Sequence, residues 1–134
     1  TMNALRKLLV DTRLAKVEAE ARLNALDALP IETWPEVRRD ADIRQLNKQI
    51  QEITTRDEAI SNRQPPGGAQ RMVNARQIER LQRERQKQAE LVRGDMETEL
   101  RVMEAKEVAI REQLAAMSAA MMAADMARSA PALP

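Results

Sequence analysis

The sequence lacks two of the residues on which much enzyme chemistry depends, since its 134 residues include no cysteine and no histidine. The chain therefore has no thiolate nucleophile, no side chain that ordinarily exchanges a proton near neutral pH, and no sulfur or imidazole ligand for zinc or copper. Glycine is also scarce, and Gly67, Gly68 and Gly94 do not form a phosphate-binding loop. We therefore expect no catalytic residues, no metal ligands and no cofactor, which predicts a protein that is not an enzyme.

Aromatic residues are nearly absent, because Trp34 is the only one and the chain has no Phe or Tyr. Hydrophobic residues still reach 43%, and they are mostly Ala, Leu, Ile, Val and Met, which fill narrow seams rather than a thick core. Charged residues add 32%, with 22 basic against 21 acidic side chains. This composition is typical of long helices with a narrow apolar stripe, so we predict an all-α fold.

Long apolar runs are absent as well. After Arg6 and Lys7 only Leu8, Leu9 and Val10 follow before Asp11 interrupts the run, which is too short for a secretory segment or a membrane span. The lack of cysteine is compatible with a reducing compartment. We therefore expect a cytoplasmic location, or a place within a virion if the chain is phage-encoded, and no membrane partner.

Proline and glycine divide the chain into three expected helices, at about 3–29, about 34–63 and about 70–127. The turn covers residues 64–69, and residues 129–134 form an expected flexible tail. At the start of the second helix, Thr33 and Glu36 have the spacing of a capping box, and Pro35 sits in the first turn. The whole chain, 1–134, is expected to form a single domain.

Apolar residues in the second and third helices recur in steps of three and four, the spacing of a coiled-coil seam. The predicted seam comprises Ile43, Leu46, Ile50, Ile53, Ile60, Ile78, Leu81, Met96, Leu100, Met103, Ile110 and Leu114. Asp57 occupies one seam position and is expected to face an arginine of the third helix. Three successive steps of four near Gly94 form a stutter, so we expect the third helix to bend or loosen there.

These lengths predict a long antiparallel α-helical hairpin, a coiled coil with one arm broken near Pro30–Pro35. Trp34 is expected to fill the space at this break, facing the region just after Gly94. In the alternative architecture the first helix folds back on the second to form a three-helix bundle, and a four-residue connector permits either arrangement.

The first helix carries two apolar stripes, which indicates two neighbours. The end of the third helix is rich in Ala and Met, small and adaptable side chains suited to close helix packing. We therefore predict a protein interface at Leu5, Leu9, Val10, Leu14, Val17, Met117, Met121 and Met122. The expected partner is protein, either a second copy of the chain or a larger assembly.

The segment Arg71–Arg93 holds seven basic residues against three acidic ones, which allows an alternative function as a nucleic-acid-binding module. The segment contains no aromatic residue to stack on bases, and the chain's net charge is only +1. A solvated helix face with pairs such as Glu79 and Arg83 is the simpler interpretation. Nucleic acid is therefore not the expected partner.

Over its whole length the three-helix pattern broadly resembles the small coiled-coil stalk proteins of flagellar and type III export ATPases. It is also similar to small helical components of phage particles. Either resemblance implies a structural part of a larger multiprotein complex. The sequence thus predicts a non-enzymatic coiled-coil structural or assembly protein.

Overall fold

The computed structural model describes residues 1–129, and every regular element in that part of the chain is helical. The elements are α1 (Met2–Asp27), the 3-10 helix η1 (Ile31–Thr33), α2 (Pro35–Arg39), α3 (Ala41–Ile60) and α4 (Ala69–Ser129). The all-α prediction is confirmed. Ser129 ends α4, and the rest of the expected tail lies outside the described residues.

The chain between α1 and α3 departs from the single helix expected over 34–63. The chain leaves helical geometry at Asp40, whose side chain accepts a hydrogen bond from the amide of Ile43 at 3.0 Å and so caps α3. The capping box predicted at Thr33 is wrong, because the Thr33 hydroxyl donates to the carbonyl of Pro30 at 2.6 Å instead. Trp34 is the N-cap of α2, with extended backbone and no side-chain cap, and Pro35 follows in the first turn as predicted.

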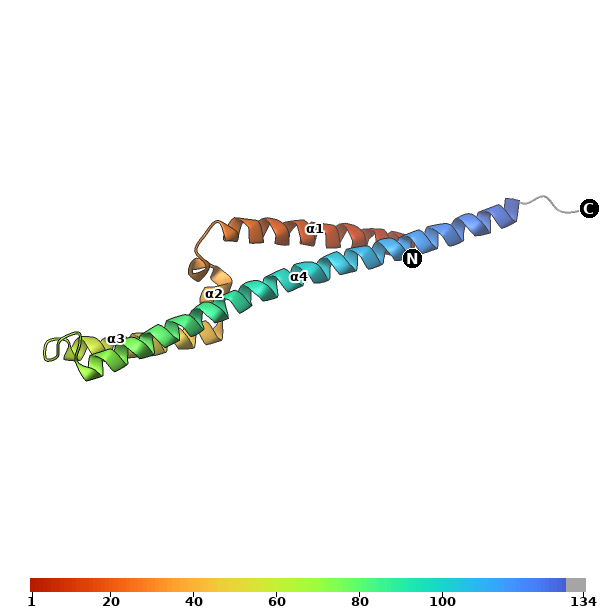
Figure 1. Cartoon of the computed structure of the whole chain (residues 1–134). Helices are drawn as coiled ribbons and strands as arrows, with labels where there is room; N and C mark the ends of the chain where they lie inside the picture. Colours follow the sequence, from red (N-terminus) through yellow and green to blue (C-terminus); the bar gives the residue numbers. More distant parts are fainter. Residues whose placement is uncertain (130–134) are drawn as a thin grey trace, which may run out of the picture. The chain divides into compact units, whose positions relative to one another are not determined.

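The chain divides into two compact units, and α4 contributes to both. The turn unit comprises residues 24–96. The terminal unit comprises residues 1–23 together with residues 97 onward. Figure 1 shows α3 beside the start of α4 within the turn unit, and α1 beside a later part of α4 within the terminal unit.

In the turn unit, α3 runs antiparallel to the beginning of α4. Asp57 bonds Arg71, and Asn47 bonds Arg85, so partners on α4 advance as positions on α3 go back. The interface between the helices buries apolar side chains from both, namely Ile43, Ile53, Leu81 and Ala89. Burial of these rows is what keeps each amphipathic helix in place.

The break between α1 and α3 encloses Trp34, which is only 1% exposed. Its indole nitrogen donates to the carbonyl of Leu29 at 3.3 Å, and the guanidinium carbon of Arg93 lies 6.0 Å from the ring centroid. The side chains of Leu26 and Val37 are also buried. Trp34 therefore lies beside the segment of α4 that contains Gly94, close to the predicted position.

In the terminal unit, α1 packs against α4. Leu9 and Ile110 are buried, and two basic residues of α1, Arg13 and Lys16, bond Glu107 of α4. The neighbour of this part of α1 is therefore the second half of α4, whereas the three-helix alternative paired it with the second helix. The α4 helix continues through Gly94, so the stutter expected there produces no break in secondary structure.

Candidate protein-interaction surface

The inner face of α1 is the face that packs against α4. The first of the two predicted stripes, which includes Leu5, Leu9 and Leu23, lies on this face and is buried or half-buried along its length. Leu9 is buried and Leu5 half-buried on this face, so these two predicted interface residues do not belong to the exposed surface of the terminal unit.

The second stripe of α1 is left uncovered within the terminal unit. We call Val10, Leu14, Val17 and Ala21 the outer stripe. The exposed fractions are 61% for Val10, 57% for Leu14 and 57% for Val17, and Ala21 is also exposed. Scattered apolar residues are normal on protein surfaces, but a row at helical spacing with this exposure is typical of a surface that meets a partner.

The methionine-rich end of α4, which we define as Met121, Met122 and Met126, is a second uncovered apolar surface of the terminal unit. The exposed fractions of these side chains are 55%, 64% and 72%. Met117 is half-buried, and it lines an open groove with Met2 and Arg6 at the start of α1. Of the predicted interface residues on α4, Met121 and Met122 are therefore the exposed ones.

The twelve predicted seam residues all lie on covered faces. Ile43, Ile53, Leu81 and Ile110 are buried. The others are half-buried, namely Leu46, Ile50, Ile60, Ile78, Met96, Leu100, Met103 and Leu114. The contrast between these residues and the outer stripe separates the apolar positions used inside the chain from those that the chain leaves open.

A charged cluster interrupts the seam of the terminal unit. The ammonium of Lys16 lies 2.7 Å from one oxygen of Glu107, and Nε of Arg13 lies 3.1 Å from the other. The hydrogen bond from Lys16, followed by that from Arg13, holds the pKa of Glu107 below its ordinary value. Glu107 in turn raises the pKa of Lys16.

This cluster was not predicted from the sequence. Lys16 and Glu107 each stand within a largely apolar stripe, so the signal in the sequence was a charged residue of each sign on helices expected to face each other. Charges of opposite sign at such positions satisfy each other when the helices pack. The cluster therefore fixes which turn of α1 meets which turn of α4.

A second polar cluster lies near the turn, around Asp57. Arg71 bonds both carboxylate oxygens of Asp57, with its Nε at 3.3 Å and its Nη2 at 3.1 Å, and the buried side chain of Asn74 donates to the same carboxylate at 3.2 Å. These bonds, first that of Arg71 and then that of Asn74, lower the pKa of Asp57. The predicted contact between Asp57 and an arginine of the third helix is confirmed.

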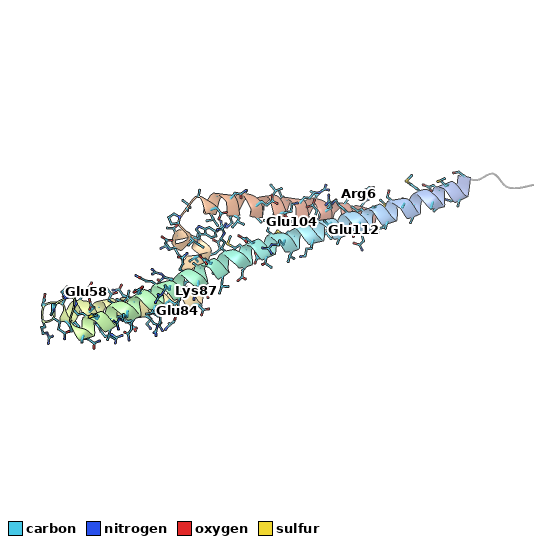
Figure 2. All side chains as sticks on the ribbon, viewed as in Figure 1. Arg6, Glu58, Glu84, Lys87, Glu104 and Glu112 are labelled. Atoms are coloured by element: carbon cyan, nitrogen blue, oxygen red, sulfur yellow. The ribbon has the colours of Figure 1, made fainter. Side chains whose placement is uncertain are left out.

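The basic residues of the predicted nucleic-acid segment are largely engaged within the chain. Arg71 pairs with Asp57, Arg93 with Asp27, and Arg85 with Asn47. Two more, Arg80 and Arg83, form ion pairs one helical turn away with Glu84 and Glu79. In Figure 2, Glu84 and Lys87 lie along the same stretch of α4, where acidic and basic side chains alternate.

Two further kinds of site are absent from the part of the chain that the structure describes. Within residues 1–129, no helix is long and apolar enough to cross a membrane. The same residues contain no group of three or more side chains of the His, Cys, Asp or Glu type placed to hold a metal ion. The candidate site is therefore the exposed apolar surface of the terminal unit.

Comparison of the chain with known protein families, with curated proteins and with solved structures gives no match in any of the three.

Proposed function

We propose that this chain is a non-enzymatic coiled-coil structural protein that joins a larger protein assembly through its terminal unit. The observation that carries the proposal is the exposure of the outer stripe of α1, where Val10, Leu14 and Val17 are each more than half exposed. Removing such a row from water is favourable, and a helical partner with a matching stripe is the simplest way to cover it.

The methionine-rich end of α4 supports the same proposal. Met121, Met122 and Met126 are exposed in the same unit as the outer stripe. Methionine side chains are unbranched and polarizable, so they adapt to partner surfaces of different shape. Two apolar surfaces in one unit favour a role in assembly over a role as an isolated helical spacer.

Binding of nucleic acid is the rival function. The ion pairs that arginines of the segment 71–93 form with acidic residues of the chain argue against it. A phosphate would have to compete with Asp57 for Arg71 and with Asp27 for Arg93. No aromatic residue stands within the segment to stack on bases. We therefore propose a protein partner.

The proposal is tested by isolating the tagged chain from its native source and identifying the proteins that accompany it. The test variant is Leu14→Gln combined with Val17→Gln, which makes the outer stripe polar. The matched control is Leu91→Gln, because Leu91 is 62% exposed but belongs to the turn unit. Circular dichroism on each variant verifies that the helices remain.

We expect the control to retain the partners of the unmodified chain and the outer-stripe variant to lose them. The identity of the partners would distinguish an export apparatus from a phage particle. Retention of every partner by the outer-stripe variant and by Met121→Gln with Met122→Gln would contradict the proposal. Tight binding of duplex DNA that weakens steeply with salt would favour the nucleic-acid function instead.

A further inference from the structure

We infer that the outer stripe of α1 binds the outer stripe of a second copy of this chain, with the two helices parallel and in register. The inference rests on the proposed function, because it names the partner that covers this surface. It is carried by the spacing of the outer stripe and by the charges that flank it.

The outer stripe has the spacing of a coiled-coil seam in its own right. Val10, Leu14, Val17 and Ala21 follow steps of four, three and four, so they occupy successive core positions of a heptad. Leu9 and Lys16, which meet α4, lie about 110–130° around the helix from the middle of the outer stripe at 100° per residue. A second helix can therefore pack on the outer stripe while α4 stays in place.

Beside Val10, Leu14 and Val17 the two flanks of the outer stripe carry opposite charges, whereas Glu20, just before Ala21, is acidic on the flank that holds the arginines. Arg13 precedes the core residue Leu14, and Arg6 precedes Lys7, which occupies the core position one heptad earlier. Asp11 and Glu18 follow the core residues Val10 and Val17. In a parallel pair, each residue that directly precedes a core position meets the residue five positions later on the other helix. Arg6 then faces Asp11 of the second copy, and Arg13 faces Glu18 of the second copy.

All four flanking side chains are exposed within the terminal unit. Arg13 bonds Glu107 through its Nε, yet 49% of its side-chain surface remains exposed. A guanidinium has five N–H donors, so Arg13 can serve an acidic partner on each side. By symmetry, a parallel dimer gains each of the two pairings twice.

The opposite orientation is less favourable for the same charges, because it brings acidic residues together. In an antiparallel pair, the positions after the core residues face each other, which places Asp11 against Glu18 of the second copy, twice. Two pairs of opposite charge offset this repulsion, namely Arg13 with Glu20 of the second copy and Arg6 with Asp27 of the second copy, although Asp27 already bonds Arg93 in its own chain. The parallel arrangement has no such repulsion along its flanks, and its like-charged contact is Lys7 with Lys7 of the second copy at the start of the seam.

The flanks also limit the assembly to two chains. A third or fourth helix would cover the positions of Arg6, Asp11, Arg13 and Glu18, and so would remove charged groups from water. The contact spans about two heptads, which is small for a protein interface. We therefore expect a dimer that dissociates in the micromolar range or above.

The orientation is tested by introducing single cysteines, since the chain has none of its own. In a parallel dimer in register, Val17→Cys places two thiols next to each other, and mild oxidation is expected to give a covalent dimer. The control is Val102→Cys, because Val102 is 49% exposed but lies on α4. Oxidation of that variant is expected to leave most of the chain monomeric.

The affinity is tested by sedimentation equilibrium on the full chain. Leu14→Gln replaces, in each copy, a leucine that the dimer would bury, so the dissociation constant is expected to rise about 100-fold or more, whereas Leu91→Gln leaves it unchanged. Asp11→Arg places like charges opposite Arg6 and weakens the dimer, most strongly at low salt. Combining it with Arg6→Glu restores the opposite charges and is expected to restore the affinity.

Several results would overturn the inference. One is a chain that stays monomeric at every concentration, with no covalent dimer of Val17→Cys. Another is a covalent dimer that forms only when Leu14→Cys and Val17→Cys are mixed, since that pairing belongs to the antiparallel orientation. A trimer or tetramer in sedimentation would overturn it equally.

The experiments distinguish failure of the dimer inference from failure of the proposed function. If the chain is monomeric but the outer-stripe variant still loses its partners in the native source, the partner is a different protein and only the present inference fails. If the dimer forms but no native partner depends on the outer stripe or the methionine-rich end, the dimer holds and the proposed assembly role fails.

Discussion

Lys16 of α1 and Glu107 of α4 are 91 positions apart in the sequence, and their charged groups lie 2.7 Å apart. Each belongs to a row of largely apolar side chains that packs against the facing helix. The side chain of Glu107 is only 9% exposed, whereas that of Lys16 is 24% exposed. The pair couples the fold of the terminal unit to pH.

Removing the charge of Glu107 is expected to weaken the terminal unit and to change its response to acid. The pKa of Glu107 is lowered from 4.5, mainly by Lys16. Its contribution to stability is therefore present above about pH 4.5 and is lost as the pH falls through the lower pKa of the folded state. Urea unfolding followed by circular dichroism should show a smaller acid-dependent loss in Glu107→Gln than in the unmodified chain. Equal losses would contradict the prediction.

Lys16 predicts the converse behaviour in alkali. Its pKa is raised from 10.5, mainly by the hydrogen bond to Glu107. Its contribution is complete below about pH 10.5 and is lost as the pH rises through the higher pKa of the folded state. The alkaline decrease in stability should therefore be smaller in Lys16→Gln. Lys48→Gln, a change at an exposed residue of α3, serves as the control and should keep the full decrease.

A double-mutant cycle is expected to show that Asp57 and Arg71 stabilise the turn unit as a pair. Asp57→Leu leaves Arg71 and Asn74 without their carboxylate, so it should lower the unfolding midpoint. Adding Arg71→Leu removes one stranded charge and extends the apolar seam, so the double variant should recover part of the loss. Additive effects of the two changes would show that the pair is not coupled.

Gly94→Ala is expected to stabilise the chain by about 0.5–1 kcal/mol, because glycine in the middle of a helix costs about that much relative to alanine. An added Cβ at Gly94 meets no atom within 4 Å, so no clash offsets the gain. Urea unfolding of the two chains measures the difference. A loss of stability would indicate that α4 uses the freedom of Gly94 in a way that alanine cannot.

Asp40→Ala is expected to cost about 1 kcal/mol, because it removes the side chain that caps α3. Thr33→Ala removes only an exposed bond to the carbonyl of Pro30 and should cost less than about 0.5 kcal/mol. The same unfolding experiment compares the two variants. A larger loss of stability in Thr33→Ala than in Asp40→Ala would contradict this prediction and support a capping role for Thr33.

The seam was predictable because steps of three and four leave little freedom in which face of a helix is covered. Asp57 was recognisable for the same reason, as the one polar residue in a run of isoleucines, and its arginine partner followed from the facing helix. What the periodicity did not supply is the exact pairing along the helices. The exact pairing depends on the number of residues in the connection between α1 and α3.

The segment around Trp34 shows why the effective length of this connection could not be predicted from the sequence. Asp27 and Asp40 are 13 positions apart, while their partners on α4, Arg93 and Gln88, are five apart. The additional residues enclose the indole, and their conformation is set by its burial rather than by local propensity. An N-cap signal was present at Asp40, but Thr33 and Glu36 offered a competing start that the burial of Trp34 overrides.

The enclosure of Trp34 also gives the chain a natural optical reporter. Trp34 is the only aromatic residue, so all of the intrinsic fluorescence arises from one indole, inside the turn unit and 1% exposed. Exposure of that indole to water should shift its emission to longer wavelength, whereas loss of helix in either unit lowers the circular dichroism signal. Comparing the two signals during unfolding therefore reveals whether the two units melt together or in sequence, without any label.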